Sequence, residues 1–172
     1  GAKTYRSGAH ALVHGFGLLY TIPSIALFVL MPLILGTSII SPVNVLVALT
    51  IYTMALMVRS GVDAFNAVPE HVVESSRALG YTPARAFFTV ELPLALPVLF
   101  AGIRVATVAN IAMVSVGAAI GVSSLGTLFT DGLARSIPAE LITGVVLSAA
   151  LAYLADALLA LTARRLTAWR TA

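Results

Sequence analysis

The chemistry that this chain can offer lies mainly in one polar stretch between long apolar segments, residues 69–93 (PEHVVESSRALGYTPARAFFTVELP). With Asp63 just upstream, the stretch holds six of the seventeen charged residues: the other five are Glu70, Glu74, Arg77, Arg85 and Glu91. A protein with so few charges is not expected to gather them without a purpose. We interpret the stretch as a docking element at a membrane surface.

The sequence predicts no catalytic centre. Hydrolysis needs a nucleophile and a base within reach of each other, and no such set is evident. No phosphate-binding GxxxxGK[ST] motif is present, and the chain has no cysteine, which excludes disulfides and thiolate chemistry. His10 and His14 have a spacing compatible with a metal, but no third ligand accompanies them. We therefore expect no enzyme activity, no metal and no cofactor bound by this chain.

Two charges stand apart inside apolar segments. Arg104 lies about three turns into one segment and Asp156 lies in the last one. Charged side chains in a membrane span are costly and usually paired or in contact with water. We expect Arg104 and Asp156 to form an intramembrane ion pair, and a role in a substrate path is the alternative.

The composition is that of an all-α, polytopic membrane protein with one domain, residues 1–172. Hydrophobic residues make up 59% of the chain and charged residues 10%, with a mean hydropathy of +1.01; soluble domains carry about 25% charged residues. The apolar runs are too long for barrel strands. The small net charge of +3 reflects loop charges that orient a membrane protein, so no nucleic-acid partner is expected.

Four spans are predicted, at about 11–35, 43–58, 94–120 and 141–161, with an outer loop at 121–139 that has room for a short re-entrant or interfacial helix. The basic residues orient them, because cytoplasmic loops carry the excess of Lys and Arg. One side has eight: Lys3, Arg6, Arg59, Arg77, Arg85, Arg164, Arg165 and Arg170. The other side has only Arg135. The hairpin and the C-terminus are therefore predicted to be cytoplasmic in a multi-pass plasma-membrane protein.

Local signals predict a helix–turn–helix hairpin within residues 66–93. Pro69 suits a first helical turn, Gly80 can adopt the left-handed conformation that ends a helix, and Thr82 is a good N-cap for a second helix. Glu74 and Arg77 are spaced to pair. The small Ser75–Ser76 pair would let another backbone approach, although an amphipathic interfacial helix without a partner is the alternative.

The spacing of the stretch resembles the EAA signature of ABC importer permeases: E-A-A, three residues, G, nine residues, I, one residue, L-P. Here the matching positions are Glu74, Gly80, Val90 and Leu92-Pro93. Ser75, Ser76 and Val90 depart from the usual alanines and isoleucine but keep small or branched side chains. The match fixes five positions over about twenty residues, so it is specific.

The resemblance implies that the hairpin is the coupling helix that inserts into a groove on an ATP-binding subunit. Glu74, Ser75, Ser76 and Gly80 would then be contact and turn residues, Arg77, Ala78 and Leu79 would complete the docked surface, and Pro93 would close the motif. ATP and Mg²⁺ would be bound by that partner. A second permease copy, identical or related, and an extracytoplasmic substrate-binding protein are the other implied partners.

Residues 20–36, 90–108 and 120–133 are similar to the osmoprotectant branch of that family, which imports glycine betaine, carnitine, choline or related quaternary amines. The implied fold is the type I ABC importer transmembrane domain, whose members carry one more N-terminal span than is visible here. Tyr20, Tyr52 and Asn110 could line a path for a cationic amine, and ordinary helix packing is the alternative. Methionine or small-oxyanion permeases, or a carrier or scaffold without an ATPase, remain rival interpretations.

Overall fold

The computed structural model describes residues 24–167, and all regular structure in that range is helical. The elements are as follows: α2 (Ser24–Leu35), α3 (Pro42–Asn66), α4 (Glu70–Ala78), α5 (Pro83–Ala86), a π-helical turn (Phe87–Glu91), α6 (Leu92–Val116), a 3₁₀ turn (Gly117–Ile120), α7 (Thr127–Ala134) and α8 (Pro138–Leu166). The predicted all-α class is confirmed for this part of the chain.

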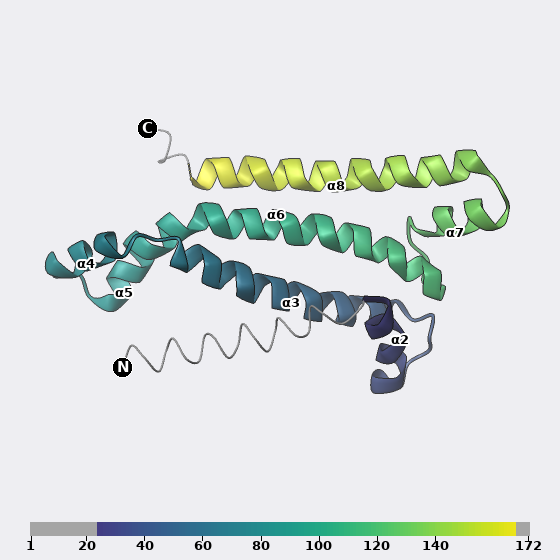
Figure 1. Cartoon of the computed structure of the whole chain (residues 1–172), viewed down its shortest axis with the longest axis horizontal. Coiled ribbons are helices and arrows are strands. Elements are labelled where there is room, and N and C mark those ends of the chain that lie inside the picture. Colours follow the sequence, from purple (N-terminus) through teal and green to yellow (C-terminus); the bar gives the residue numbers. More distant parts are fainter. Residues whose placement is uncertain (1–23, 168–172) are drawn as a thin grey trace.

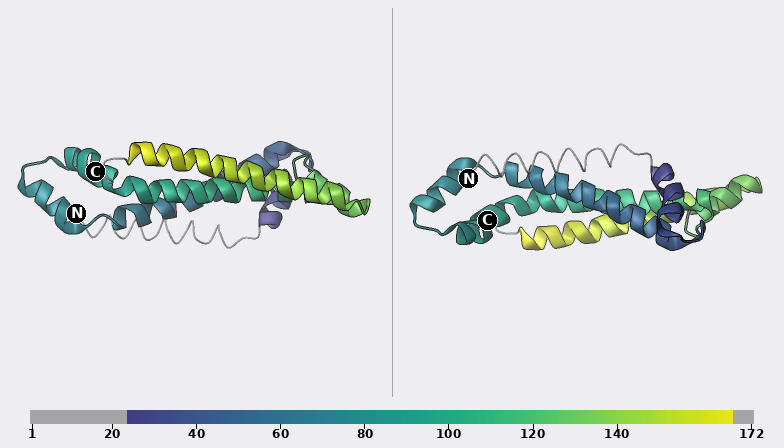
Figure 2. Two further views of the ribbon diagram at one scale, coloured as in Figure 1. Left: turned by 90° about the horizontal axis from the view of Figure 1, so that it is seen from above. Right: turned by 90° about the horizontal axis from the view of Figure 1, so that it is seen from below.

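Three long helices form the body of the molecule, with α6 between α3 and α8 (Figures 1 and 2). Each is long and apolar enough to cross a membrane: Pro42–Asn66, Pro83–Ile120 and Pro138–Leu166. A 25-residue helix is about 38 Å long, which exceeds the thickness of the hydrocarbon core. The short helix α7 packs back against α8 at one end, and α4 and α5 project from the other (Figure 1).

The first predicted span, about 11–35, is described only from Ser24 onward. That part is the 12-residue helix α2, which is too short to cross a bilayer and lies across the end of α3 (Figure 1). The predicted span at about 11–35 extends beyond the described residues, so the count of four spans stays a prediction. Among residues 24–167, three helices are long and apolar enough to cross a membrane.

Two helices are longer than predicted. The sequence predicts a polar turn at residues 59–68, but α3 continues through Arg59 and Asp63 to Asn66. Polar residues can extend a spanning helix beyond the bilayer because its backbone is already satisfied by internal hydrogen bonds. The last helix likewise extends from the predicted 141–161 to Pro138–Leu166. The predicted short helix in 121–139 is present as α7.

Small residues let the long helices approach closely. A Cβ atom at Gly102 of α6 would lie 2.5 Å from the Cβ of Ser60 on α3, and one at Gly144 of α8 would lie 2.8 Å from the Cβ of Leu128 on α7. The apolar core lies near the α2 end of the bundle, where Phe28, Tyr52 and Val122 are buried together. These contacts join α2, α3 and the loop after α6.

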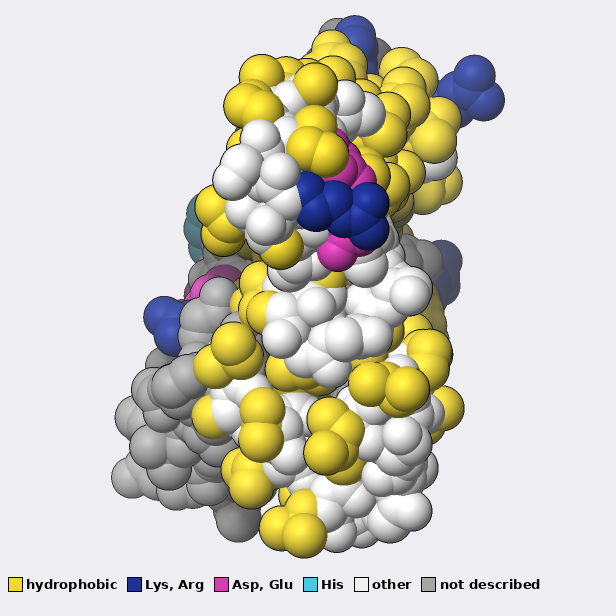
Figure 3. Space-filling view, turned by 90° about the vertical axis from the view of Figure 1, so that its right-hand side faces the viewer, with side chains coloured by type: hydrophobic (Ala, Val, Ile, Leu, Met, Phe, Trp, Pro, Cys, Tyr) yellow, Lys and Arg dark blue, Asp and Glu magenta, His cyan; other side chains and the backbone are white. Residues whose placement is uncertain are grey.

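The two ends of the bundle differ in charge. Figure 3 looks onto the α7 end, where hydrophobic and uncharged side chains surround a small charged group. Asp131 and Arg135 of α7 approach within 3.9 Å there, and both are exposed. The opposite end holds the hairpin and the last turn of α8, with Arg164 and Arg165. The charge asymmetry that the sequence indicated thus separates the two ends of one helical bundle.

Candidate functional site

The hairpin of residues 66–93 stands at the end of the bundle, beyond the start of α6 (Figure 1). Its first helix, α4, has Glu70 in its first turn and Arg77 in its last turn, which are the charges that a helix dipole favours at those ends. The predicted helix 69–79 and the observed α4 agree within one residue at each end. The second helix, α5, runs through the π-helical turn into α6.

Gly80 forms the turn between the two helices. Its φ is +82°, a conformation that is costly for any residue with a Cβ. The N–H of Gly80 donates to the carbonyl of Arg77 at 2.9 Å, and the N–H of Tyr81 donates to the carbonyl of Ser76 at 3.1 Å. These two bonds make a Schellman motif, which satisfies carbonyls at the helix end. The turn is therefore fixed in direction by the backbone.

Side chains then hold α5 in place. The N–H of Arg85 donates to Oγ1 of Thr82 at 3.4 Å, so Thr82 caps this helix. The guanidinium of Arg85 lies 4.5 Å from the ring centroid of Tyr81, within the range of a cation–π contact. Phe87 stacks on Phe65 of α3 with ring centroids 5.4 Å apart. The hairpin is thus tied both to itself and to α3.

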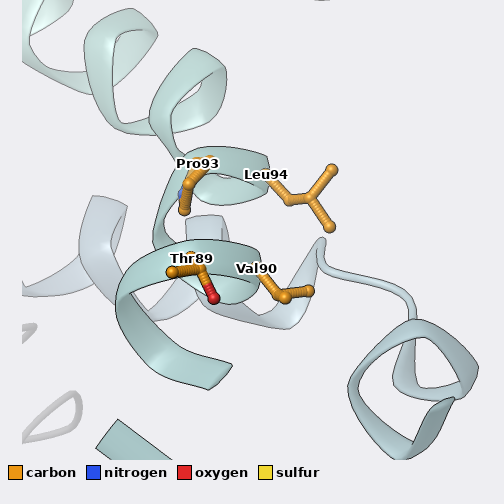
Figure 4. A pocket seen from close by; sticks show the side chains of 4 residues that line it. All are labelled: Thr89, Val90, Pro93 and Leu94. Atoms are coloured by element: carbon orange, nitrogen blue, oxygen red, sulfur yellow. The ribbon is translucent and has the colours of Figure 1, made fainter. Parts of the chain in front are cut away.

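The π-helical turn explains how Leu92-Pro93 can occupy a continuous helix. Proline has no N–H and its ring crowds the carbonyl four residues earlier, and a π turn relieves such crowding by lengthening the hydrogen-bonded ring. The N–H of Leu92 donates to the carbonyl of Phe87, five residues back. A groove of about 410 Å³ opens beside this turn, lined by Thr89, Val90, Pro93 and Leu94 (Figure 4).

The outer surface of α4 is open to a partner. Glu74, Ser75, Arg77, Ala78 and Leu79 are exposed, and Leu79 retains 78% of its surface. In the part of the chain that the structure describes, Glu74 and Arg77 form no ion pair with each other, contrary to the sequence interpretation. Both charges therefore remain available for a partner.

Ser76 differs from the other predicted contact residues. Its side chain is buried, with 6% exposed, and its Oγ donates to the carbonyl of Val73 at 2.7 Å. Ser76 therefore does not form part of the exposed surface of α4, and its role as a contact residue stays a prediction. Ser75 is exposed, with Oγ donating to the carbonyl of His71 at 2.7 Å.

The two intramembrane charges lie together. Nε of Arg104 donates to one carboxylate oxygen of Asp156 at 2.7 Å, and Nη2 donates to the other at 2.6 Å. The pair joins α6 to α8, and its side chains remain 40% and 30% exposed. A second groove, of about 580 Å³, opens beside the pair.

The other predicted path residues lie in helix contacts. Tyr52 is buried in the core beside α2, and Nδ2 of Asn110 donates to Oγ1 of Thr53 across the α3–α6 contact at 2.7 Å. The sequence interpretation missed Thr53, although a threonine in an apolar span is a recognised partner for a neighbouring polar residue. Tyr20, His10 and His14 lie outside the described residues. Nothing in residues 24–167 gathers three potential metal ligands.

Comparison with known proteins identifies the family. The family described as binding-protein-dependent transport system inner membrane component matches residues 10–168. This chain belongs to that family. The predicted family is therefore confirmed, and its match covers both the hairpin and the three long helices.

Relatives with assigned roles support this membership. The chain is 40% identical over 145 residues to the osmoprotectant import permease protein OsmW of Salmonella typhimurium, covering 83% of this chain and 67% of OsmW. It is 33% identical over 162 residues to the choline transport system permease protein OpuBB of Bacillus subtilis, covering 94% and 73%. It is 37% identical over 153 residues to EgtU of Helicobacter pylori, an ergothioneine transport permease and binding protein. That match covers 88% of this chain but 27% of EgtU.

A solved structure gives the same fold. A chain of the MetNI methionine ABC transporter, in an inward-facing conformation, matches with a TM-score of 0.77 and 28% identity, over 97% of this chain and 77% of that chain. The expected fold, an ABC importer transmembrane domain, is therefore confirmed.

Proposed function

We propose that this chain is the membrane-spanning permease subunit of an ATP-driven importer, and that its hairpin docks on a separate ATP-binding subunit. The observation that carries the proposal is the open surface of α4, held at the end of the bundle by a rigid turn at Gly80. Glu74, Ser75, Arg77 and Leu79 present charged, polar and apolar groups together on that surface. The spacing of residues 74–93 supports the same assignment.

The geometry suits transmission of movement. Helix α5 passes without a loop into α6, so a push on the hairpin reaches the spanning helix directly. The stacked Phe65 and Phe87 connect the same segment to α3. We infer that closure of two ATP-binding subunits would move the hairpins, and that α3 and α6 would follow as a rigid body. Rigid-body movement about an interface is a common basis for such transitions.

Orientation and partners follow from the same account. The basic end of the bundle, with Arg77, Arg85, Arg164 and Arg165, would face the cytoplasm of a bacterial cell. ATP and Mg²⁺ would be held by the partner subunit. Two permease copies, identical or related, would enclose the path, and an extracytoplasmic binding protein would deliver the substrate. The family description names a binding-protein-dependent system, which supports the last assignment.

For the substrate we propose osmoprotectants of the glycine betaine, carnitine and choline type. The names of OsmW, OpuBB and OpuCB, the last a glycine betaine/carnitine/choline permease at 31% identity over 162 residues, support this class. Methionine is the second candidate, because the matched solved structure is a methionine transporter. Ergothioneine is a third, on the strength of EgtU.

Reconstituted uptake tests the proposal. The permease would be purified with its candidate ATP-binding and substrate-binding subunits, placed in liposomes, and supplied with ATP. We expect uptake of glycine betaine, carnitine or choline that needs ATP and the binding protein. Uptake of methionine or ergothioneine alone would reassign the substrate. Uptake that persists without any ATP-binding subunit would contradict the importer mechanism and favour a carrier.

A further inference from the structure

We propose that the groove beside the Arg104–Asp156 pair is a site on the transport path that binds the carboxylate end of a zwitterionic substrate. The inference rests on the proposed import function and adds to it a location and a chemical requirement. The groove is formed by α6 and α8, and is lined by Ala101, Arg104, Val105, Val108, Ala109 and Asp156. The ion pair supplies the charged groups on an otherwise apolar and small-residue wall.

The depth of the groove argues against contact with lipid tails. Arg104 is central in α6 (Leu92–Val116), about 18 Å from each end of the helix. Its side chain is 40% exposed and that of Asp156 is 30% exposed. Ionised groups at such a depth almost always face a bundle interior or a water-filled cavity. We infer that the open side of this groove faces the aqueous path in the assembled permease pair.

One edge of the Arg104 guanidinium has no hydrogen-bond partner within residues 24–167 and can therefore bind a ligand. The bonds to Asp156 use Nε and Nη2, and Nη1 makes no bond to any residue within 24–167. An arginine has five N–H donors in a fixed planar arrangement, so the two on Nη1 and the second one on Nη2 remain available. One N–H from each of these two nitrogens points outward in parallel, and such a pair binds a carboxylate bidentately.

Charge balance then selects the class of substrate. The ion pair is neutral as a whole, and a zwitterion is neutral too, so binding would leave no uncompensated charge in the groove. The carboxylate of the substrate would meet Arg104 while its cationic end lies toward Asp156. A trimethylammonium group has no N–H and cannot displace Arg104 from Asp156. Choline has no carboxylate and carries a net charge, so it would gain nothing from Nη1.

Thiol labelling tests the location. The chain has no cysteine, so Val105→Cys, at a position 61% exposed, would place one thiol in the groove of the complete complex with cysteine-free partner subunits. We expect a charged, membrane-impermeant methanethiosulfonate to label it on the order of tenfold faster than Leu158→Cys, since labelling rate follows thiol access. Leu158, on α8 and outside the groove, is similarly exposed at 64% and serves as the control.

The labelling experiment also shows whether a substrate occupies the groove. Carboxylate-bearing zwitterions (glycine betaine, carnitine, methionine and ergothioneine) would be added singly, and we expect the imported one to slow labelling of Val105→Cys while choline does not. Equal, slow labelling at both positions would place the groove against lipid and overturn the proposal. Labelling of Val105→Cys that is not slowed by the imported zwitterion would overturn it as well.

Coupling measurements test the chemistry. The double variant Arg104→Gln/Asp156→Asn removes both charges but keeps similar shapes and one hydrogen-bonded contact. We expect it to retain ATP hydrolysis stimulated by the loaded binding protein, while zwitterion import per ATP falls by about tenfold, the scale of one lost charge-assisted hydrogen bond. Zwitterion import by the double variant at the wild-type rate would overturn the proposal. A wild-type complex that imports none of these compounds would contradict the proposed function. If, in addition, no zwitterion slows labelling of Val105→Cys, the proposed site would be ruled out as well.

Discussion

The guanidinium of Arg104 on α6 and the carboxylate of Asp156 on α8 meet through two hydrogen bonds, of 2.7 and 2.6 Å, across 52 residues of sequence. The two helices lie side by side along the bundle (Figure 1). A bidentate pair fixes both the separation and the orientation of its groups. The pair therefore sets the register of α6 against α8.

Reversal of either charge should disrupt that register. We expect Arg104→Asp and Asp156→Arg each to lower the yield of folded protein in membranes, because each places two like charges together. The double exchange Arg104→Asp/Asp156→Arg should restore the yield, although not transport. Fluorescence-detected size-exclusion chromatography after heating would measure the effect. A double variant no more stable than the single ones would show that the pair does not hold the helices together.

Gly80 should be essential for coupling but not for membrane insertion. With φ at +82°, an alanine there costs about 1–2 kcal/mol, and relaxation of that strain would redirect α4. We expect Gly80→Ala to insert normally and to lose most ATPase coupling. Gly61→Ala is the matched control: Gly61 lies inside α3, and a Cβ added there would meet no atom within 4 Å, so alanine should stabilise the helix by about 0.5–1 kcal/mol. Equal coupling in the two variants would argue against a fixed turn.

The contact between α3 and α6 should respond to the size of two small residues. A Cβ at Gly102 would lie 2.5 Å from the Cβ of Ser60, so Gly102→Ala should push the helices apart and cost about 1–3 kcal/mol. Adding Ser60→Gly removes the obstructing atom and should recover most of the loss. Thermal unfolding in detergent would compare the single and double variants. Unchanged stability in Gly102→Ala alone would mean that these helices do not pack as closely as described.

The hydrogen bond from Asn110 to Thr53, at 2.7 Å, should stabilise the same contact modestly. Interhelical hydrogen bonds in membranes average about 0.6 kcal/mol and reach about 1.7 kcal/mol. A double-mutant cycle with Asn110→Leu and Thr53→Val should yield a coupling energy in that range. If instead Asn110→Leu impairs transport while the coupling energy is near zero, Asn110 would belong to the substrate path.

Local signals made the hairpin predictable from the sequence. Pro69, Gly80 and Thr82 act within one or two turns of themselves, so their effects do not depend on the rest of the fold. The pairing of Arg104 with Asp156 was also predictable, because charges inside apolar spans are few and need partners. Both predictions rest on residue types that fit only a few backbone conformations or environments.

Features that depend on tertiary contacts were not predictable. Hydropathy placed Ser24–Leu35 inside a span, but its position across the end of α3 is set by packing around Phe28. The burial of Ser76 depends on how α4 folds back on the following helix, which residue type does not indicate. The extension of α3 past Arg59 and Asp63 was missed because polar residues signal the edge of the bilayer and not the end of a helix.

Cross-linking tests the central claim most directly. Ser75 and Ser76 are neighbours of the same size, but Ser75 is exposed while Ser76 is 6% exposed. In this cysteine-free chain, we expect Ser75→Cys to cross-link to a co-expressed ATP-binding subunit in a manner that changes with ATP. Ser76→Cys should cross-link far less, and Glu74→Lys should abolish the Ser75→Cys product. A Ser75→Cys permease that transports normally but reaches no ATP-binding subunit in any nucleotide state would contradict the docking role of the hairpin.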